Sequence, residues 1–167
     1  MKKSILTVAL ALFVVSMFVV VSTAVAGEGR PDMTRAAGEV KVAKDDKGVV
    51  TGVKIADQEV ALDEMGKDLA ALMDGKKTEA AGTLADGKLA LRRFSVEVVG
   101  TVAKAEEGYT VTVGKSTFKA QDREKKLEAF DGKEAQITGM LMLGRENAKM
   151  LMVRDAKEAP KKEEKTE

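Results

Sequence analysis

Asp74-Gly75-Lys76, five further residues and Gly82 make a pattern that the chain uses twice, because Asp131-Gly132-Lys133 is followed by Gly139 at the same spacing. The residues around each copy repeat as well. Before the copies stand Gly38-Glu39-Val40 and Gly100-Thr101-Val102, and after them stand Leu89-Ala90-Leu91-Arg92 and Leu151-Met152-Val153-Arg154. Self-similarity at a fixed period is the signature of repeated structural units. The sequence therefore predicts two small β-rich units in tandem.

The first 26 residues have the layout of a secretory signal peptide. Lys2 and Lys3 precede an apolar run, and Ala24-Val25-Ala26 is a small-residue cleavage site before Gly27. We therefore expect a periplasmic or secreted protein. The apolar stretch 5–26 also matches the roughly 20 residues that span a bilayer, so an uncleaved membrane anchor is the alternative. In both cases the rest of the chain lies outside the cytoplasm.

The composition excludes several kinds of site. The chain has no cysteine and no histidine, which rules out a disulfide, a Ser-His-Asp triad and a zinc site made of Cys and His. Without Lys2 and Lys3, the 28 basic residues fall to 26 against 27 acidic ones, a net charge of −1. Nucleic-acid-binding proteins normally show a basic stripe or a high pI, and polybasic segments mark attachment to anionic membranes. We therefore expect no nucleic-acid partner, and a membrane partner only if the signal stays uncleaved.

Changes in periodicity divide the rest of the chain. Residues 27–37 contain Gly, Pro and Asp without periodicity, which is typical of a linker. The first repeat covers 38–95 and the second covers 96–156. Residues 157–167 consist mostly of Lys, Glu, Pro and Thr, which predicts a disordered charged tail.

Both repeats show strand and helix patterns in the same order. In the second repeat apolar residues alternate along the strands, and Asp122 can cap a short helix that buries Leu127 and Phe130. In the first repeat Asp63 can cap a helix whose apolar residues recur at helical spacing, at Met65, Leu69, Leu72 and Met73. The glycine of each Asp-Gly-Lys motif follows the helix and can supply the left-handed residue that ends it. The order is three strands, one helix and two strands.

This order resembles the OB-fold, a partly open five-stranded barrel. Each repeat is similar to small bacterial OB-fold domains of secreted and periplasmic proteins, where a first strand like Val98-Val99-Gly100-Thr101-Val102 and a late Gly-Lys strand with a second Gly are typical. The resemblance implies a mainly β protein of two tandem OB-like barrels, with one short helix each. One fused β-sandwich of about ten strands is the alternative. Because no linker separates Phe94 from Val96, and a unit of about 60 residues is only marginally stable, we expect a monomer with rigidly packed repeats.

Four methionines are the candidate metal ligands. Met140 and Met142 lie on one predicted strand and Met150 and Met152 on the next, so each pair projects from one face of its strand. If the register brings the pairs together, four thioethers converge, and thioethers select Cu(I) and by the same logic Ag(I). The pattern resembles periplasmic copper and silver chaperones built on a small OB-like barrel, but this chain has no His and no Trp. The alternative is that these methionines fill apolar gaps in a core or between the repeats.

Other groups of residues suggest no site. The acidic pairs Asp45-Asp46 and Glu106-Glu107 occupy the same predicted loop in each repeat but lack the spacing of a hard-cation site. The few aromatic residues fall at core positions, without the stacking surface that single-stranded nucleic acid needs.

The sequence therefore predicts a non-enzymatic, exported binding or interaction module of the bacterial envelope. We identify no catalytic residue and no organic cofactor, and expect an envelope protein, a glycan or a small molecule as the ligand. Binding of Cu(I) or Ag(I) by the four methionines is the alternative function.

Overall fold

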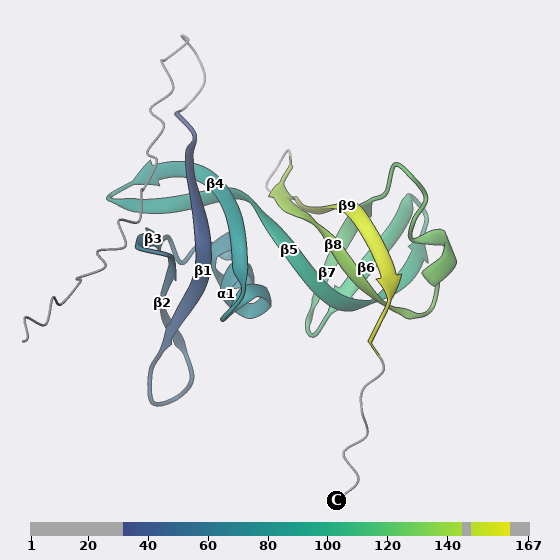
Figure 1. The fold of residues 1–167 in the computed structure, drawn as a ribbon, viewed down its shortest axis with the longest axis horizontal. Coiled ribbons are helices and arrows are strands. Elements are labelled where there is room, and N and C mark those ends of the chain that lie inside the picture. The colour runs from purple at the N-terminus through teal and green to yellow at the C-terminus, as the bar shows by residue number, and fades with distance from the viewer. Residues whose placement is uncertain (1–31, 145–147, 161–167) are drawn as a thin grey trace, which may run out of the picture. The chain divides into compact units, whose positions relative to one another are not determined.

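The computed structural model describes residues 32–144 and 148–160, and this part of the chain is mainly β (Figure 1). The signal peptide or anchor predicted for 1–26 lies outside the described residues. None of the helices within the described ranges is long and apolar enough to cross a bilayer.

The first repeat begins with four strands and one α-helix. In chain order they are β1 (Thr34–Lys44), β2 (Val50–Ile55), β3 (Gln58–Val60), α1 (Glu64–Met73) and β4 (Lys77–Ala85). Asp63 caps α1 as predicted, since its carboxylate accepts a hydrogen bond of 2.9 Å from the backbone N–H of Gly66. Met65, Leu69 and Met73 are buried on the inner side of this helix.

The second repeat has a much shorter helical segment. Its own elements are β6 (Gly108–Val113), β7 (Ser116–Gln121), the 3-10 helix η1 (Glu128–Phe130), β8 (Glu134–Leu143) and β9 (Lys149–Glu158). The predicted helix after Asp122 is thus a single turn. The predicted cap at Asp122 is wrong, because Leu127 is the residue before η1 and no side chain caps this turn. The Asp122 Oδ2 instead accepts a 2.7 Å hydrogen bond from the backbone N–H of Leu127. Leu127 is fully buried as predicted, whereas Phe130 is half-buried.

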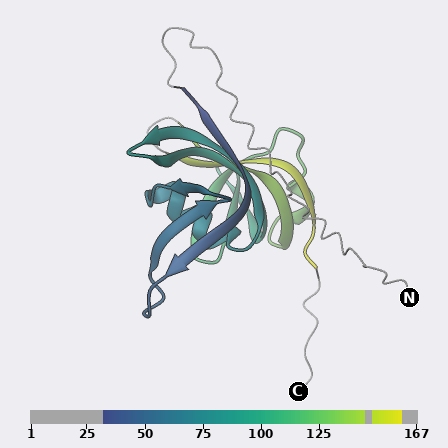
Figure 2. The same cartoon turned by 60° about the vertical axis from the view of Figure 1, so that its left-hand side comes forward.

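One strand, β5 (Lys88–Ala105), belongs to both repeats. Its first half pairs with β4, its second half with β6, and its stretch from Arg93 to Thr101 with β8. The predicted boundary between Ser95 and Val96 therefore falls inside a strand. The described residues form nine strands, all joined in one sheet. β5 can be followed from one group of strands to the other in Figure 1, and Figure 2 shows the same ribbon turned by 60°.

Within each repeat the strand pairings form a closed circuit. The first circuit runs β1–β2–β3–β5–β4 and returns to β1, and only its β3–β5 pairing is parallel. The second circuit runs β5–β6–β7–β9–β8 and returns to β5, and only its β7–β9 pairing is parallel. β5 is the last strand of one circuit and the first of the other, so the repeat seen in the sequence is also a repeat of topology.

A single hydrophobic core extends through both repeats. Phe94, near the middle of β5, is fully buried and lies opposite Ala80 of β4 and Leu141 of β8. Burial of such a side chain contributes about 2 kcal/mol to folding. Other fully buried side chains come from both repeats and include Ile55, Leu69, Leu89, Leu91, Leu127, Ile137 and Leu151.

The Asp-Gly-Lys motif forms the same type II β-turn in each repeat. Gly75 occupies the third position with a φ of 71°, a conformation that favours glycine. The Lys76 N–H donates to the carbonyl of Met73 at 2.9 Å, and the Gly75 N–H donates to the carbonyl of Val40 at 3.0 Å. The N–H of Val40 donates to the carbonyl of Lys76 at 2.8 Å. The second copy makes the same hydrogen bonds, all of 2.9 Å, through Gly132, Lys133, Phe130 and Val102.

The last glycine of each pattern lies where the strand register shifts. Gly82 follows a bulge in the β4–β5 pairing, and Gly139 follows one in the β8–β9 pairing. A Cβ at Gly82 would be 2.0 Å from the carbonyl oxygen of Ala90, and a Cβ at Gly139 would be 2.4 Å from that of Met152. Only glycine permits this approach of the two backbones, which explains the position without any binding chemistry.

Two predicted boundaries differ from the structure by a few residues. Residues 34–37, expected in the linker, begin β1 and pair with β4. Residues 157 and 158, expected in the tail, end β9 and pair with the start of β8. These short stretches are small or charged and show little hydrophobic alternation, so the backbone pairing with a neighbouring strand is what places them in the sheet.

We predict that Gly139→Ala destabilises the protein by about 2 kcal/mol or more, because the added Cβ forces β8 and β9 apart. Thermal or urea unfolding followed by circular dichroism measures the loss. Gly52→Ala in β2 is the matched control, since its Cβ would meet Ala43 Cβ at an ordinary 3.7 Å. Equal stability of the two variants would contradict the role assigned to the bulge.

Candidate functional site

The register of β8 and β9 pairs the four methionines across the two strands. Met140 lies directly opposite Met152, and Met142 lies directly opposite Met150. Side chains opposite each other on antiparallel strands have Cβ atoms about 5 Å apart and share one face of the sheet. The condition set by the sequence, that the register should bring both pairs together, is met. We call these four side chains the methionine face.

The methionine face points away from the hydrophobic core. Leu141 and Leu151 alternate with the methionines and are each 1% exposed, so they occupy the inner side. The four methionines are partly exposed. An unbranched thioether side chain with three rotatable bonds can turn its sulfur toward a neighbour or toward a ligand.

The first repeat carries the same positions without methionine. In the β4–β5 pairing, which has its bulge at the same place, Thr83 lies opposite Ala90 and Ala85 lies opposite Lys88. Thr83 and Ala85 follow Gly82 by one and three residues, as Met140 and Met142 follow Gly139. Their partners Ala90 and Lys88 therefore correspond to Met152 and Met150. Since the first repeat folds with Thr, Ala and Lys there, the topology itself does not require methionine at these sites.

Polar and basic residues flank the methionine face on both sides. On β5, Ser95 lies beside Met140 and Arg93 beside Met142. On β7, Lys119 and Gln121 lie beside β9, opposite Met150 and Met152 respectively. The two flanking cations disfavour a highly charged metal ion at this face.

An ion-pair clamp connects the end of the methionine face to α1. Lys149 precedes Met150, and its Nζ lies 2.7 Å from Asp68 Oδ2 and 3.1 Å from Glu64 Oε2. Asp68 is buried, and its Oδ2 has no hydrogen bond of regular geometry from the described residues, so the Lys149 ammonium is what balances its charge. Burial alone lowers the pKa of Lys149, but the two carboxylates together raise it more, and the pKa lies above its ordinary value of 10.5.

Next to this clamp is a cavity of about 360 Å³ at the junction of the repeats. It opens where one edge of β5 has no strand partner, between the pairing of Leu89 with β3 and that of Arg93 with β8. Its apolar lining comes from both repeats, and its charged lining includes Arg92, which forms no ion pair within the described part of the chain. The complete lining is Asp63, Glu64, Met65, Ala90, Leu91, Arg92, Leu143 and Lys149.

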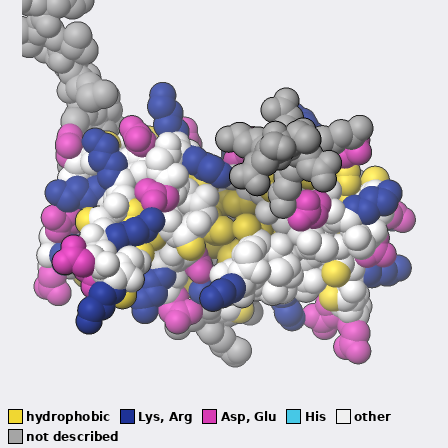
Figure 3. All heavy atoms as spheres, turned by 90° about the horizontal axis from the view of Figure 1, so that it is seen from below, with side chains coloured by type: hydrophobic (Ala, Val, Ile, Leu, Met, Phe, Trp, Pro, Cys, Tyr) yellow, Lys and Arg dark blue, Asp and Glu magenta, His cyan; other side chains and the backbone are white. Residues whose placement is uncertain are grey.

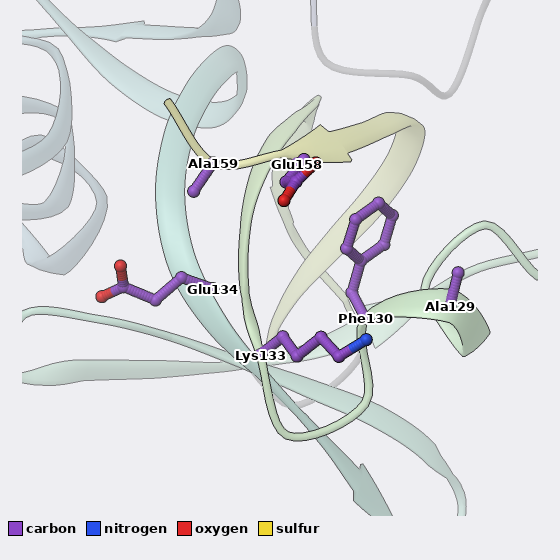
Figure 4. A pocket seen from close by; sticks show the side chains of 6 residues that line it. All are labelled: Ala129, Phe130, Lys133, Glu134, Glu158 and Ala159. Atoms are coloured by element: carbon purple, nitrogen blue, oxygen red, sulfur yellow. The ribbon is translucent and has the colours of Figure 1, made fainter. Parts of the chain in front are cut away.

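A second hollow, of about 470 Å³, lies beside η1 (Figure 4). Ala129, Phe130, Lys133, Glu134, Glu158 and Ala159 line it. The carboxylate of Glu134 points away from the Phe130 ring, so the charged groups do not converge (Figure 4). This arrangement offers neither a nucleophile with a base nor a set of ligands.

Asp45, from one of the acidic pairs noted in the sequence, has a structural role. Asp45 Oδ1 accepts hydrogen bonds from the backbone N–H groups of Lys47 and Val49, at 2.9 and 2.8 Å, so it closes its own loop. Among the described residues, no three His, Cys, Asp or Glu side chains gather as a metal-binding group. Basic and acidic side chains are interspersed around a hydrophobic patch on the face in Figure 3, without a continuous basic stripe.

Comparison with known proteins identifies no relative, since no family model, curated protein or solved structure matches the chain. Sequence reasoning found the methionines but missed the clamp and the junction cavity. Lys149, Asp68 and Arg92 are ordinary surface residue types, far apart in the chain, and no local pattern marks them.

We predict that Lys149→Met destabilises the protein by about 1–3 kcal/mol, because it leaves the buried Asp68 carboxylate without its counter-charge. Folding raises the pKa of Lys149. The stability that the charged Lys149 side chain adds to the fold is therefore fully present below pH 10.5, and it is lost as the pH rises through the folded-state pKa. Urea unfolding of wild type and variant at a series of pH values tests both statements.

Glu64→Gln serves as the control for the clamp. Glu64 is 80% exposed, so its removal should change stability by less than about 0.5 kcal/mol. A Lys149→Met variant as stable as wild type at pH 7 would show that the clamp does not hold the repeats together in solution.

Proposed function

We propose that the protein is a non-enzymatic, exported binding protein of the envelope, and that its second repeat binds a soft monovalent metal ion, Cu(I) or Ag(I). Met140, Met142, Met150 and Met152 are the proposed ligands. The observation that carries the proposal is the register, which sets Met140 opposite Met152 and Met142 opposite Met150 on an outward face.

The geometry suits a single ion held by several thioethers. Directly opposite residues have Cβ atoms about 5 Å apart, and residues two apart along a strand are about 7 Å apart. The flexible methionine side chain can span these separations and direct its sulfur toward one point. Sulfur donors without a carboxylate or an imidazole favour soft Cu(I) and Ag(I) over Ca²⁺, Mg²⁺ or Zn²⁺.

The flanking residues also favour a monovalent ion. Arg93 and Lys119 lie beside Met142 and Met150, and their repulsion of a bound cation grows in proportion to its charge. The first repeat, with Thr83, Ala85, Lys88 and Ala90 at the corresponding positions, has no soft donor there. We therefore assign the metal to the second repeat alone, at one ion per chain.

We also propose that each repeat is an OB-like barrel. The closed circuit of five strands, with a helical segment between the third and fourth, supports this assignment in both repeats. In this arrangement β5 is shared, and the methionine face lies on the outside of the second barrel.

Metal binding is tested by titrating the purified protein with Ag(I) in chloride-free buffer and with Cu(I) under anaerobic, reducing conditions. We expect saturation near one equivalent. The double variant Met142→Leu and Met150→Leu should lose affinity by at least about tenfold, or about 1.4 kcal/mol of binding free energy. Because Met-to-Leu changes keep volume and cost less than about 1.5 kcal/mol, the variant should stay folded.

Met33→Leu is the matched control, since Met33 is an exposed methionine outside the methionine face. It should bind Ag(I) as wild type does. Unchanged binding by the double variant, or equal loss in the Met33 variant, would rule out the methionine face as the metal site.

The second candidate function is binding of a small acidic ligand or the acidic segment of an envelope protein in the junction cavity. The observation in its favour is Arg92, an exposed guanidinium without an ion pair in the described ranges, next to the apolar side chains of Leu91 and Leu143. Screening peptidoglycan fragments and acidic peptides by thermal shift tests this function. A hit should lose its shift in Arg92→Ala, and a shift that survives this change would place the ligand elsewhere.

A further inference from the structure

The methionines of the described residues differ in access to solvent, and Met33, which lies outside the methionine face, is 46% exposed. Met65 and Met73 are 0% and 2% exposed and pack between α1 and the sheet, whereas the methionine face is partly exposed. The chain has no cysteine and no tryptophan, so its thioethers are the side chains that oxidise most readily. An oxidant in the surroundings of the protein would therefore act first on exposed methionine.

We propose that the methionine face is a reversible oxidation site, and that its oxidation by a peroxide switches off the soft-metal binding proposed above. In each event a thioether sulfur attacks one peroxide oxygen, so that an S–O bond forms and the O–O bond breaks. The sulfur is oxidised by two electrons to a sulfoxide. The proton of the transferred oxygen passes to the departing hydroxide, and one water is released.

The surroundings of the methionine face suit the sulfoxide as well as the thioether. A sulfoxide oxygen is a strong hydrogen-bond acceptor, and residues able to donate lie on both sides of the face. They are Arg93 and Ser95 on β5 and Lys119 and Gln121 on β7, each paired in register with one methionine. The basic residues that disfavour a highly charged metal can thus stabilise the oxidised face.

Oxidation removes the property on which metal binding rests. The sulfoxide presents an oxygen in place of a free thioether sulfur, and a hard oxygen donor does not select Cu(I) or Ag(I). The change is reversible because methionine sulfoxide reductases return each sulfoxide epimer to the thioether. Bound metal in turn occupies the sulfur lone pairs and should shield them from the peroxide.

The oxidation rates are measured on the purified, metal-free protein exposed to hydrogen peroxide, by mass spectrometry of its proteolytic peptides. Cleavage after Lys and Arg separates the methionine face from Met65 and Met73, which are the buried internal controls. The four methionines of the face should gain oxygen at least about tenfold faster than these two, because core methionines react only when the core opens. Equal rates for both groups would overturn the proposal.

The switch is tested by titrating the oxidised protein with Ag(I). Its affinity should fall by at least tenfold, recover after treatment with both methionine sulfoxide reductases, and be accompanied by an unchanged far-ultraviolet circular dichroism spectrum. The variant with all four methionines of the face replaced by leucine should gain no oxygen in these peptides. Undiminished Ag(I) binding by the oxidised protein, or loss of its fold, would overturn the switch.

The metal dependence separates this inference from the proposed function on which it rests. Ag(I) added before peroxide should slow oxidation of the methionine face and leave Met33 unprotected. Failure of the reduced protein to bind Ag(I) would overturn the proposed function and the switch together, while the peptide rates would still decide whether the face is an oxidation site.

Discussion

The structure depends on the backbone hydrogen bonding of one strand. β5 has β4 and β6 along one edge and β3 and β8 along the other, so it closes both circuits of strands. Without this strand neither circuit would be closed. Phe94 near its midpoint is buried between residues of both repeats, so the shared backbone and the shared core coincide. A unit of about 60 residues would be marginally stable alone, and sharing a strand removes that limit because both units bury surface together.

The chain then uses one local geometry twice. In each repeat the type II turn after the helix forms backbone hydrogen bonds with a valine of the first strand, Val40 or Val102. The bulge at Gly82 or Gly139 then sets the register of the last two strands. This register decides which residues of β8 and β9 face outward. If it slipped by one residue, the leucines would face solvent and the methionines would enter the core. The glycine pattern and the methionine face are therefore connected, since one bulge positions the four thioethers.

An ion pair also connects the second repeat to helix α1 of the first. Lys149 lies at the start of β9 and contacts Asp68, whose Oδ2 has no hydrogen bond of regular geometry from the described residues. Removing one partner of such a pair is costly chiefly because it leaves the other charge buried without compensation. The clamp, the junction cavity and the methionine face are neighbours along β9 and β5.

The repeat, the strand and helix order, the cap at Asp63 and the pairing of methionines within each strand could be predicted from the sequence. These are local properties, set by alternation along a strand, capping at fixed spacing and the conformational freedom of glycine. Three features came from the structure: the boundary at Ser95 and Val96 lies within a strand, Met140 lies opposite Met152, and Lys149 forms an ion pair with Asp68. Each of these depends on hydrogen-bond register or on contact between distant segments. No short stretch of sequence encodes a strand register or a contact between distant segments, because the register results from the closure of the whole sheet.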